Sequence, residues 1–186
     1  MLADTQSPLL LHTRPGGAQD APFLRALFDS HCAHLHALGL PPAALQALVD
    51  QQYAFRQADY GRRFPQARTV IALAGHEPIG ALVLDDDDDT LHIVDLAVAP
   101  HSRGCGHGRT LVQQVQAQAR EMGRQAVTLS VNPLNQPALR LYLALGFEAT
   151  EQQPVQWRML WRPLPPREAH EDPRAKPSFI STITKG

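Results

Sequence analysis

The strongest constraint on the fold is a glycine-rich segment that lies between an expected strand and an expected helix. It follows the apolar run 91–99 and precedes apolar residues at helical intervals in 111–122, after which a β-branched run covers 125–131. Strand, helix and strand in this order predict two parallel strands joined by a right-handed crossover. The segment itself consists of Arg103, Gly104, Cys105, Gly106, His107, Gly108 and Arg109.

This segment has the properties of an anion cradle. Its glycines allow a tight turn and a close approach of the backbone to a ligand, and the helix that follows presents unpaired N–H groups and the positive end of its dipole. Arg103 and Arg109 add positive charge. We therefore predict that backbone amides from Gly104 to Arg109 hold a pyrophosphate, and a glycine-rich connecting turn is the alternative.

Two common phosphate-binding motifs fit the segment poorly. The P-loop requires a lysine after its last glycine, but Arg109 follows Gly108. The dinucleotide fingerprint requires a third glycine where Arg109 stands and an acidic residue after the next strand, which runs into Asn132. A dinucleotide-binding oxidoreductase therefore remains an alternative function, but the glycine-rich segment argues against it.

The rest of the chain predicts a sheet with flanking helices. Asp20 is the expected N-cap of the first helix, after a helix-breaking segment at 15–17. The aspartates at 85–89 form a charged turn, which is either simply solvated or attracts a basic acceptor molecule. Residues 163–186 are rich in proline and are expected to be a flexible tail after a domain at 1–162. The expected strands are 8–14, 69–74, 79–84, 91–99, 125–131 and 155–161, and the expected helices are 21–38, 43–63, 111–122 and 132–146.

Composition limits the classes of protein that remain. A chain of 186 residues with 44% hydrophobic residues can bury one core, and a net charge of −1 gives no broad surface for nucleic acid or anionic membranes. With two cysteines, no leader and no apolar span, we expect a cytoplasmic protein, monomeric or homodimeric. No metal is expected, because the nearest candidate ligands point along different stripes of one helix: His31, Cys32, His34 and His36.

Two motifs at the right separation resemble the GNAT N-acetyltransferase superfamily. The glycine-rich segment matches its Arg/Gln-x-x-Gly-x-Gly/Ala motif, and a second segment resembles its Asn-x-x-Ala-x-x-Leu-Tyr-x-x-x-Gly-Phe pattern through Asn135, Ala138, Leu141, Tyr142, Gly146 and Phe147. Arg14-Pro15 followed by Asp20-Ala21 resembles its usual opening, so the resemblance covers 8–162. It implies an α/β (α+β) fold with a mixed, mostly antiparallel twisted sheet of six to seven strands, splayed parallel central strands and about four flanking helices.

The resemblance also implies a mechanism. Acetyl-CoA would lie between the splayed strands 91–99 and 125–131, and a neutral amine would attack it directly in a ternary complex. A small-molecule amine is expected rather than a protein. Tyr142 stands where the family keeps the acid that protonates the leaving thiolate, and a tyrosine that only packs in the core is the alternative. Besides the glycine-rich segment, the implied coenzyme contacts are Asn135, Tyr142 and the backbone of Leu96, Ala97 and Val98, with the Val98 N–H polarising the thioester carbonyl.

The general base is left open between two residues. Asp95 is a carboxylate in an apolar strand, so it either binds the acceptor or is held by a structural hydrogen bond. His92 occupies a place where some family members keep an acidic base, or it is an exposed histidine at the start of the strand. Strand alternation places His92, Val94, Leu96 and Val98 on one face and Ile93, Asp95 and Ala97 on the other. A non-catalytic acyl-CoA-binding module on the same scaffold is the rival function.

Overall fold

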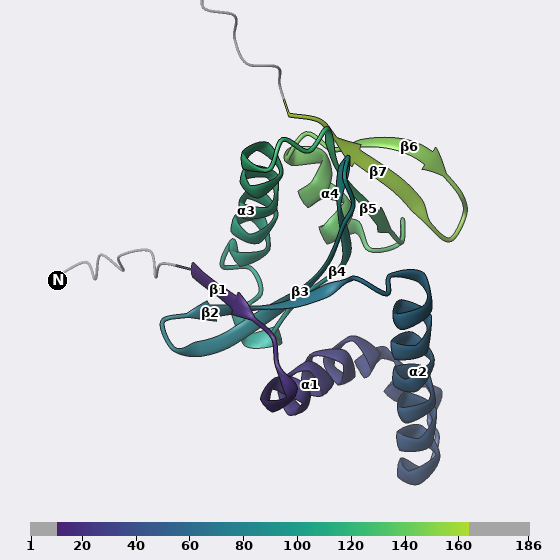
Figure 1. The fold of residues 1–186 in the computed structure, drawn as a ribbon. Coiled ribbons are helices and arrows are strands. Elements are labelled where there is room, and N and C mark those ends of the chain that lie inside the picture. The colour runs from purple at the N-terminus through teal and green to yellow at the C-terminus, as the bar shows by residue number, and fades with distance from the viewer. Residues whose placement is uncertain (1–10, 164–186) are drawn as a thin grey trace, which may run out of the picture.

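The computed structural model describes residues 11–163, which form a seven-stranded sheet with helices on both faces (Figure 1). The strand order is β1-β2-β3-β4-β5-β7-β6, and every neighbouring pair except β4 and β5 is antiparallel. This confirms the predicted fold class. The strands are β1 (Leu11–Pro15), β2 (Arg68–Ala74), β3 (Glu77–Asp86), β4 (Thr90–Val98), β5 (Ala126–Val131), β6 (Glu148–Gln152) and β7 (Trp157–Trp161). The helices are α1 (Ala21–His31), α2 (Pro42–Arg63), α3 (His107–Glu121) and α4 (Gln136–Ala144), with short 3-10 helices at Ala18–Asp20, Cys32–Leu38 and Pro100–Ser102.

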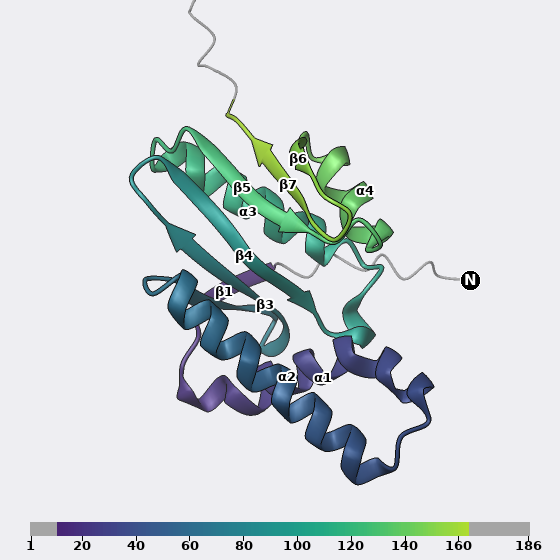
Figure 2. The ribbon, with the colours of Figure 1, turned by 90° about the vertical axis from the view of Figure 1, so that its right-hand side faces the viewer.

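The two faces of the sheet are covered by different helices. The large core joins α3 and α4 to one face, through residues such as Leu111, Val115 and Leu139. A smaller cluster joins Leu27 of α1 to Ile71 and other strand residues on the opposite face. In Figure 1 the strands β3 and β4 accordingly pass between α3 above and α1 below, and Figure 2 shows α1 and α2 below them with α2 nearest the viewer. Residues on successive positions of β4 therefore face different helices.

The central strands part, as the resemblance implied. In the parallel ladder, Thr90–Ile93 of β4 pair with Ala126–Leu129 of β5. β4 then continues to Val98 and β5 to Val131 without further pairing to each other. The strands thus diverge at the point where the chain leads into the glycine-rich loop.

A β-bulge corrects the predicted faces of β4. Val83 of β3 pairs with Asp95 and Leu84 with Ile93, so Val94 is an extra residue in β4. Ile93 belongs to the core under α3, and Leu96 and Val98 also pack on that core. The prediction that His92 shares a face with Leu96 and Val98 was wrong, because the extra residue reverses the alternation after position 94; His92 lies on the face of Asp95 and Ala97.

Smaller differences concern the edges of the sheet. The strand β6 was not among the expected segments, because its residues alternate between exposed and half-buried on an edge and carry little apolar signal. Pro15 ends β1 instead of breaking it, which an edge strand tolerates. Asp85 and Asp86 extend β3, so the turn is shorter than expected. Residues 8–10 of the first expected strand and the tail beyond Pro163 lie outside the described residues.

The helices α1 and α2 are linked by a third cluster of Phe28, Cys32, Leu35 and Val49. This cluster is separate from both clusters on the sheet. α2 is therefore held to the fold mainly by α1 and by polar contacts at its inner side.

Within residues 11–163, no helix combines the length and the apolar character that crossing a membrane requires.

Asp20 stabilises the corner between β1 and α1. It stands at the predicted N-cap position of α1, but its carboxylate makes no cap bond to that helix. Instead the two oxygens accept hydrogen bonds from Arg14 at 2.7 and 2.8 Å, and one also accepts the Gly17 N–H at 2.9 Å. The Arg14 bonds, followed by the Gly17 bond, lower the pKa of Asp20 from 3.8 to about 2.

We predict that the stabilising effect of Asp20 is lost in acid. Because its pKa is lower in the folded chain than in the unfolded chain, the stabilisation is present above about pH 4 and disappears as the pH falls through about 2. The difference in unfolding free energy between the wild type and Asp20→Asn, measured by urea unfolding, should shrink over this range. Asp88→Asn, in the exposed turn, controls for the loss of one charge. A difference that does not change with pH would contradict the prediction.

Candidate active site

A pocket of about 420 Å³ lies between the end of β4, the glycine-rich loop and α4. It contains most of the predicted coenzyme-binding residues. Ala97 and Cys105 do not line it: the Ala97 side chain packs with Leu27 on the other face, and the exposed Cys105 thiol turns to the Arg103 carbonyl. The lining residues are Leu96, Val98, Ser102, Arg103, Gly104, Gly106, His107, Gly108, Arg109, Asn135, Pro137, Ala138, Leu141 and Tyr142.

The loop is shaped by two glycines with positive φ. Gly104 has φ 77° and Gly106 has φ 82°, a conformation that other residues rarely adopt. Helix α3 begins directly after Gly106, and its first backbone bond runs from the Thr110 N–H to the Gly106 carbonyl at 3.1 Å. The N–H groups of residues 107–109 therefore have no backbone acceptor in the described chain and form a donor set for an anion.

The backbone of β4 also presents free polar groups to the pocket. The Ala99 N–H donates to Ile79 at 2.8 Å, and Ala97 lies so close to β3 that a Cβ on Gly80 would be 2.6 Å from the Ala97 oxygen. Since successive residues of a strand direct their polar groups to opposite sides, those of Leu96 and Val98 point away from β3. Ala97 thus contributes neither its side chain nor its peptide groups to the pocket.

Arg103 has a structural contact that sequence reasoning did not show. Its Nε donates to the Val98 carbonyl at 2.9 Å, and its Nη2 donates to the Ser30 hydroxyl at 3.0 Å. The side chain therefore ties the loop to β4 and to α1. The Val98 N–H remains without an acceptor in the described chain.

Tyr142 is a protonated donor at the base of this pocket. It extends from α4, which begins after Asn135, whose side-chain oxygen accepts the Ala138 N–H at 3.3 Å. Only 7% of Tyr142 is exposed, and its hydroxyl has no hydrogen-bond partner among residues 11–163. Burial raises the pKa of Tyr142 to about 12, with a further contribution from the charge of Asp95. The phenol thus keeps its proton at neutral pH.

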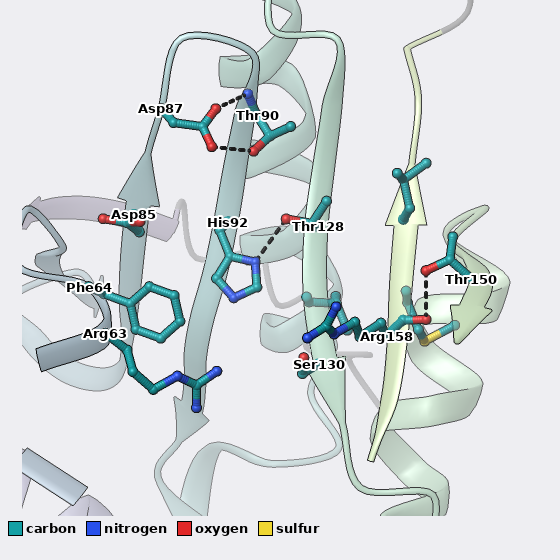
Figure 3. Close-up of a pocket in the computed structure, with 13 residues that line it drawn as sticks. Arg63, Phe64, Asp85, Asp87, Thr90, His92, Thr128, Ser130, Thr150 and Arg158 are labelled. Atoms are coloured by element: carbon teal, nitrogen blue, oxygen red, sulfur yellow. Dashed lines mark hydrogen bonds between the residues drawn. The ribbon is translucent and has the colours of Figure 1, made fainter. Parts of the chain in front are cut away.

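A second pocket of about 360 Å³ lies on the opposite face of the sheet (Figure 3). His92 lies at its centre, with Nδ1 2.8 Å from the Thr128 Oγ1 and its ring stacked on Phe64 at 5.2 Å. Burial lowers the pKa of His92; the charge of Asp85 opposes this shift, while the charges of Arg63 and Arg158 strengthen it. The imidazole is therefore neutral at neutral pH and is able to accept a proton.

Asp95 lines neither pocket. Its carboxylate forms an ion pair with Arg56 of α2, a residue that sequence reasoning missed. The Arg56 guanidinium lies between Phe28 and Tyr60, 5.3 and 5.1 Å from their ring centroids. This pair docks α2 on β4. The contacts of Asp95 in the described chain are therefore structural.

The second pocket joins residues that no sequence motif brought together. Thr128 lies beside His92 in the parallel register, which the sequence alone did not give. The others come from the end of α2, from β3 and the turn after it, and from β4, β5, β6 and β7. Besides His92 and Asp85, the polar and aromatic residues around the pocket are Arg63, Phe64, Asp87, Thr90, Thr128, Ser130, Thr150 and Arg158.

Two of the remaining candidate ligands have local partners. His31 and His34 place Nδ1 2.9 Å from backbone carbonyls of their own helical segment. Among residues 11–163, no group of three histidine, cysteine or acidic side chains is arranged to hold a metal ion.

The aspartates of the turn between β3 and β4 also have partners. Asp87 accepts the N–H groups of Asp89 and Thr90, and Asp86 pairs with Arg124 at 2.9 Å, so both aspartates shape the turn.

Comparison with known families agrees with this geometry. The acetyltransferase (GNAT) family model matches residues 30–147, which include β4, the glycine-rich loop and α4. The chain belongs to the GNAT acetyltransferase family. This GNAT chain is 34% identical over 98 residues to the rat N-acetyltransferase 8F1, a match that covers 50% of this chain and 43% of the relative. It is 30% identical over 114 residues to the Escherichia coli peptidyl-lysine N-acetyltransferase YjaB, covering 60% of this chain and 71% of that protein.

Solved GNAT structures share the fold. The Thermoplasma acidophilum PaiA N-acetyltransferase, in complex with coenzyme A, aligns with a TM-score of 0.64 and 15% identity over 82% of this chain and 99% of that one. An acetyltransferase from Thermus thermophilus aligns with a TM-score of 0.60 and 21% identity over 83% and 98% of the chains. At these identities the likeness shows the architecture alone.

We predict that His92 titrates below the ordinary histidine value of 6.5, because it is buried beside two guanidinium groups. In NMR titrations, Arg158→Gln and Arg63→Gln should each raise its pKa toward that value. Arg62→Gln is the matched control, since Arg62 adjoins Arg63 on α2 and does not line the pocket. An unchanged midpoint in both pocket variants would show that the guanidinium groups do not face the imidazole.

Proposed function

We propose that this chain is an acetyl-CoA-dependent N-acetyltransferase that transfers acetyl to the primary amine of a small molecule. The observation that carries the proposal is the parting of β4 and β5 after Ile93 and Leu129, with one pocket on each face of the sheet at these strands. Such an arrangement admits donor and acceptor from opposite faces, which suits direct attack within a ternary complex. Family membership and the coenzyme complexes of related folds support the choice of donor.

The residues of the first pocket fit acetyl-CoA, which supplies an activated acetyl thioester when bound. The free amides of residues 107–109 and the dipole of α3 suit its diphosphate, and Arg109 adds a positive charge. The outward backbone groups of Leu96 and Val98 suit the amides of the pantetheine arm. The Val98 N–H is the donor we assign to the thioester oxygen, where it favours the charge that develops during transfer.

Proton transfer is assigned to one residue from each pocket. His92 is neutral and accepts the proton of the incoming amine, whereas Asp95 is already engaged with Arg56. When the His92 Nδ1–H donates to Thr128, its Nε2 presents a lone pair. Tyr142 keeps its proton at neutral pH and donates it to the departing thiolate.

The proposal is tested with purified protein, acetyl-CoA and a panel of primary amines. Release of free CoA thiol together with an acetylated amine, identified by mass spectrometry, is the expected result. Binding of acetyl-CoA without transfer to any amine would instead favour the non-catalytic acyl-CoA-binding module. Absence of binding in titration calorimetry would remove both functions.

We predict that Gly106→Ala weakens acetyl-CoA binding by about tenfold, because a side chain at φ 82° costs about 1–2 kcal/mol and shifts the loop. Gly39→Ala is the matched control. Gly39 also has positive φ, at 63°, and open space around a Cβ, but it lies in the link between α1 and α2. Both variants should lose similar stability in thermal melts, and only Gly106→Ala should change the calorimetric affinity. Equal affinities would exclude the loop from coenzyme binding.

We predict that Tyr142→Phe lowers kcat about 100-fold, the scale of general acid catalysis, with a smaller change in the KM for acetyl-CoA. The variant keeps the buried ring and its 5.7 Å contact with Phe147, so the fold is retained. Steady-state kinetics with the best amine of the panel measure both constants. An unchanged kcat would remove Tyr142 from the mechanism and leave it a packing residue.

A further inference from the structure

The second pocket has charges of opposite sign at its two ends. Asp85 and Asp87 lie toward the turn between β3 and β4, whereas Arg63 and Arg158 extend toward each other at the level of Ser130 (Figure 3). Asp87 is occupied by backbone and side-chain bonds within the turn. The end of the pocket near Ser130 is therefore positive, with the neutral His92 beside it.

The two guanidinium groups are only lightly engaged by the protein. Arg63 contacts Asp59 at 3.3 Å, but Asp59 is also bonded by Arg62 at 2.9 Å, so that carboxylate has a closer partner. Arg158 contacts Glu151 at 3.3 Å, and 70% of the Arg158 side chain is exposed. Exposed ion pairs of this kind contribute little to stability, so most donors of both groups remain available to a ligand.

The Arg63 side chain nevertheless packs on an aromatic ring of the pocket. Its Cζ lies 5.1 Å from the centroid of Phe64, and the Phe64 ring in turn stacks on His92. Arg158 reaches the same space from β7, and both residues influence the titration of His92. Two guanidinium groups that face one space are a binding arrangement for a carboxylate, which accepts paired hydrogen bonds from such forks.

The location of these groups limits how far the carboxylate can be from the reacting amine. Ser130 follows Leu129, the last β5 residue of the parallel ladder, so the positive end of the pocket lies where the strands part. The amine has to reach the thioester through this same region. An anionic group held by Arg63 and Arg158 must therefore be close to the amino group.

We propose that the acceptor is a small α-amino acid whose carboxylate is bound by Arg63 and Arg158. This inference rests on the proposed transfer of acetyl to an amine in this pocket. The carboxylate fixes the α-amino group at the parting of β4 and β5, and the side chain of the amino acid extends along Phe64 and His92 toward Asp85. The positive charges also favour the neutral form of the amine, which is the form that attacks.

The test compares phenylalanine, leucine, glutamine and lysine with their amides, which keep the amine and the side chain but lack the negative charge. The wild type should use the preferred amino acid with a kcat/KM about 10- to 100-fold above that of its amide, as expected for two charge-assisted hydrogen bonds. Arg63→Gln and Arg158→Gln should each reduce this ratio about tenfold, and Arg158→Lys should restore part of it. Arg62→Gln, the neighbouring control, should leave the ratio unchanged.

A binding measurement separates this inference from the proposed function. The His92 ring resonances are followed by NMR while each amino acid or amide is added without acetyl-CoA. Saturable shifts with an amino acid, absent with its amide and lost in Arg158→Gln, would support the carboxylate site even if no amine were acetylated. Equal use of acid and amide by the wild type, equal shifts with both, or an undiminished preference in both arginine variants would overturn it.

Discussion

The end of the parallel ladder between β4 and β5 is the constraint on which both pockets depend. A strand that loses its neighbour leaves peptide groups unpaired, and each buried unpaired group costs about 1–3 kcal/mol. Here the ladder stops at Ile93, and the bulge at Val94 follows at once. A bulge bends its strand and increases its twist, so it directs β4 away from β5. Arg103 bonds the Val98 carbonyl, while other peptide groups of this segment face the pocket.

The two faces of the sheet remain electrostatically connected at this parting. Asp95 lies on the face covered by α2, yet its charge contributes to the raised pKa of Tyr142, which extends from α4 on the opposite face. Arg56 pairs with Asp95 and holds α2 in place at the same time. Asp95, the residue that anchors α2 and with it the wall of the second pocket, is therefore also the charge that the phenol of the first pocket experiences.

Local sequence rules predicted the parts of the structure that local interactions determine. The glycines of the loop, the helix that follows them and the two parallel strands on either side were all recognisable, because turn chemistry and periodicity act within a few residues. The faces of β4 were not, since the bulge depends on its pairing with β3 and Val94 is as apolar as its neighbours. The strand β6 was missed because its edge position demands no apolar alternation.

Contacts between distant segments were also beyond prediction. Arg56 and Asp95 are 39 residues apart, and nothing near either of them indicates the pairing. The guanidinium groups of the second pocket come from α2 and β7, whose proximity follows only from the complete sheet. Even the recognised family pattern concerned the first pocket, because that pocket is built from two continuous segments, β4 with the glycine-rich loop and the segment of α4.

The separate cluster of Phe28, Cys32, Leu35 and Val49 has a consequence for the evolution of this chain. It sets the angle at which α2 leaves α1, and therefore where Arg63 and Phe64 stand, without touching the core that supports α3. Repacking these few side chains would move the wall of the second pocket and leave the glycine-rich loop intact. Under the proposed function, the preference for an acceptor can thus diverge between descendants while the donor is inherited unchanged.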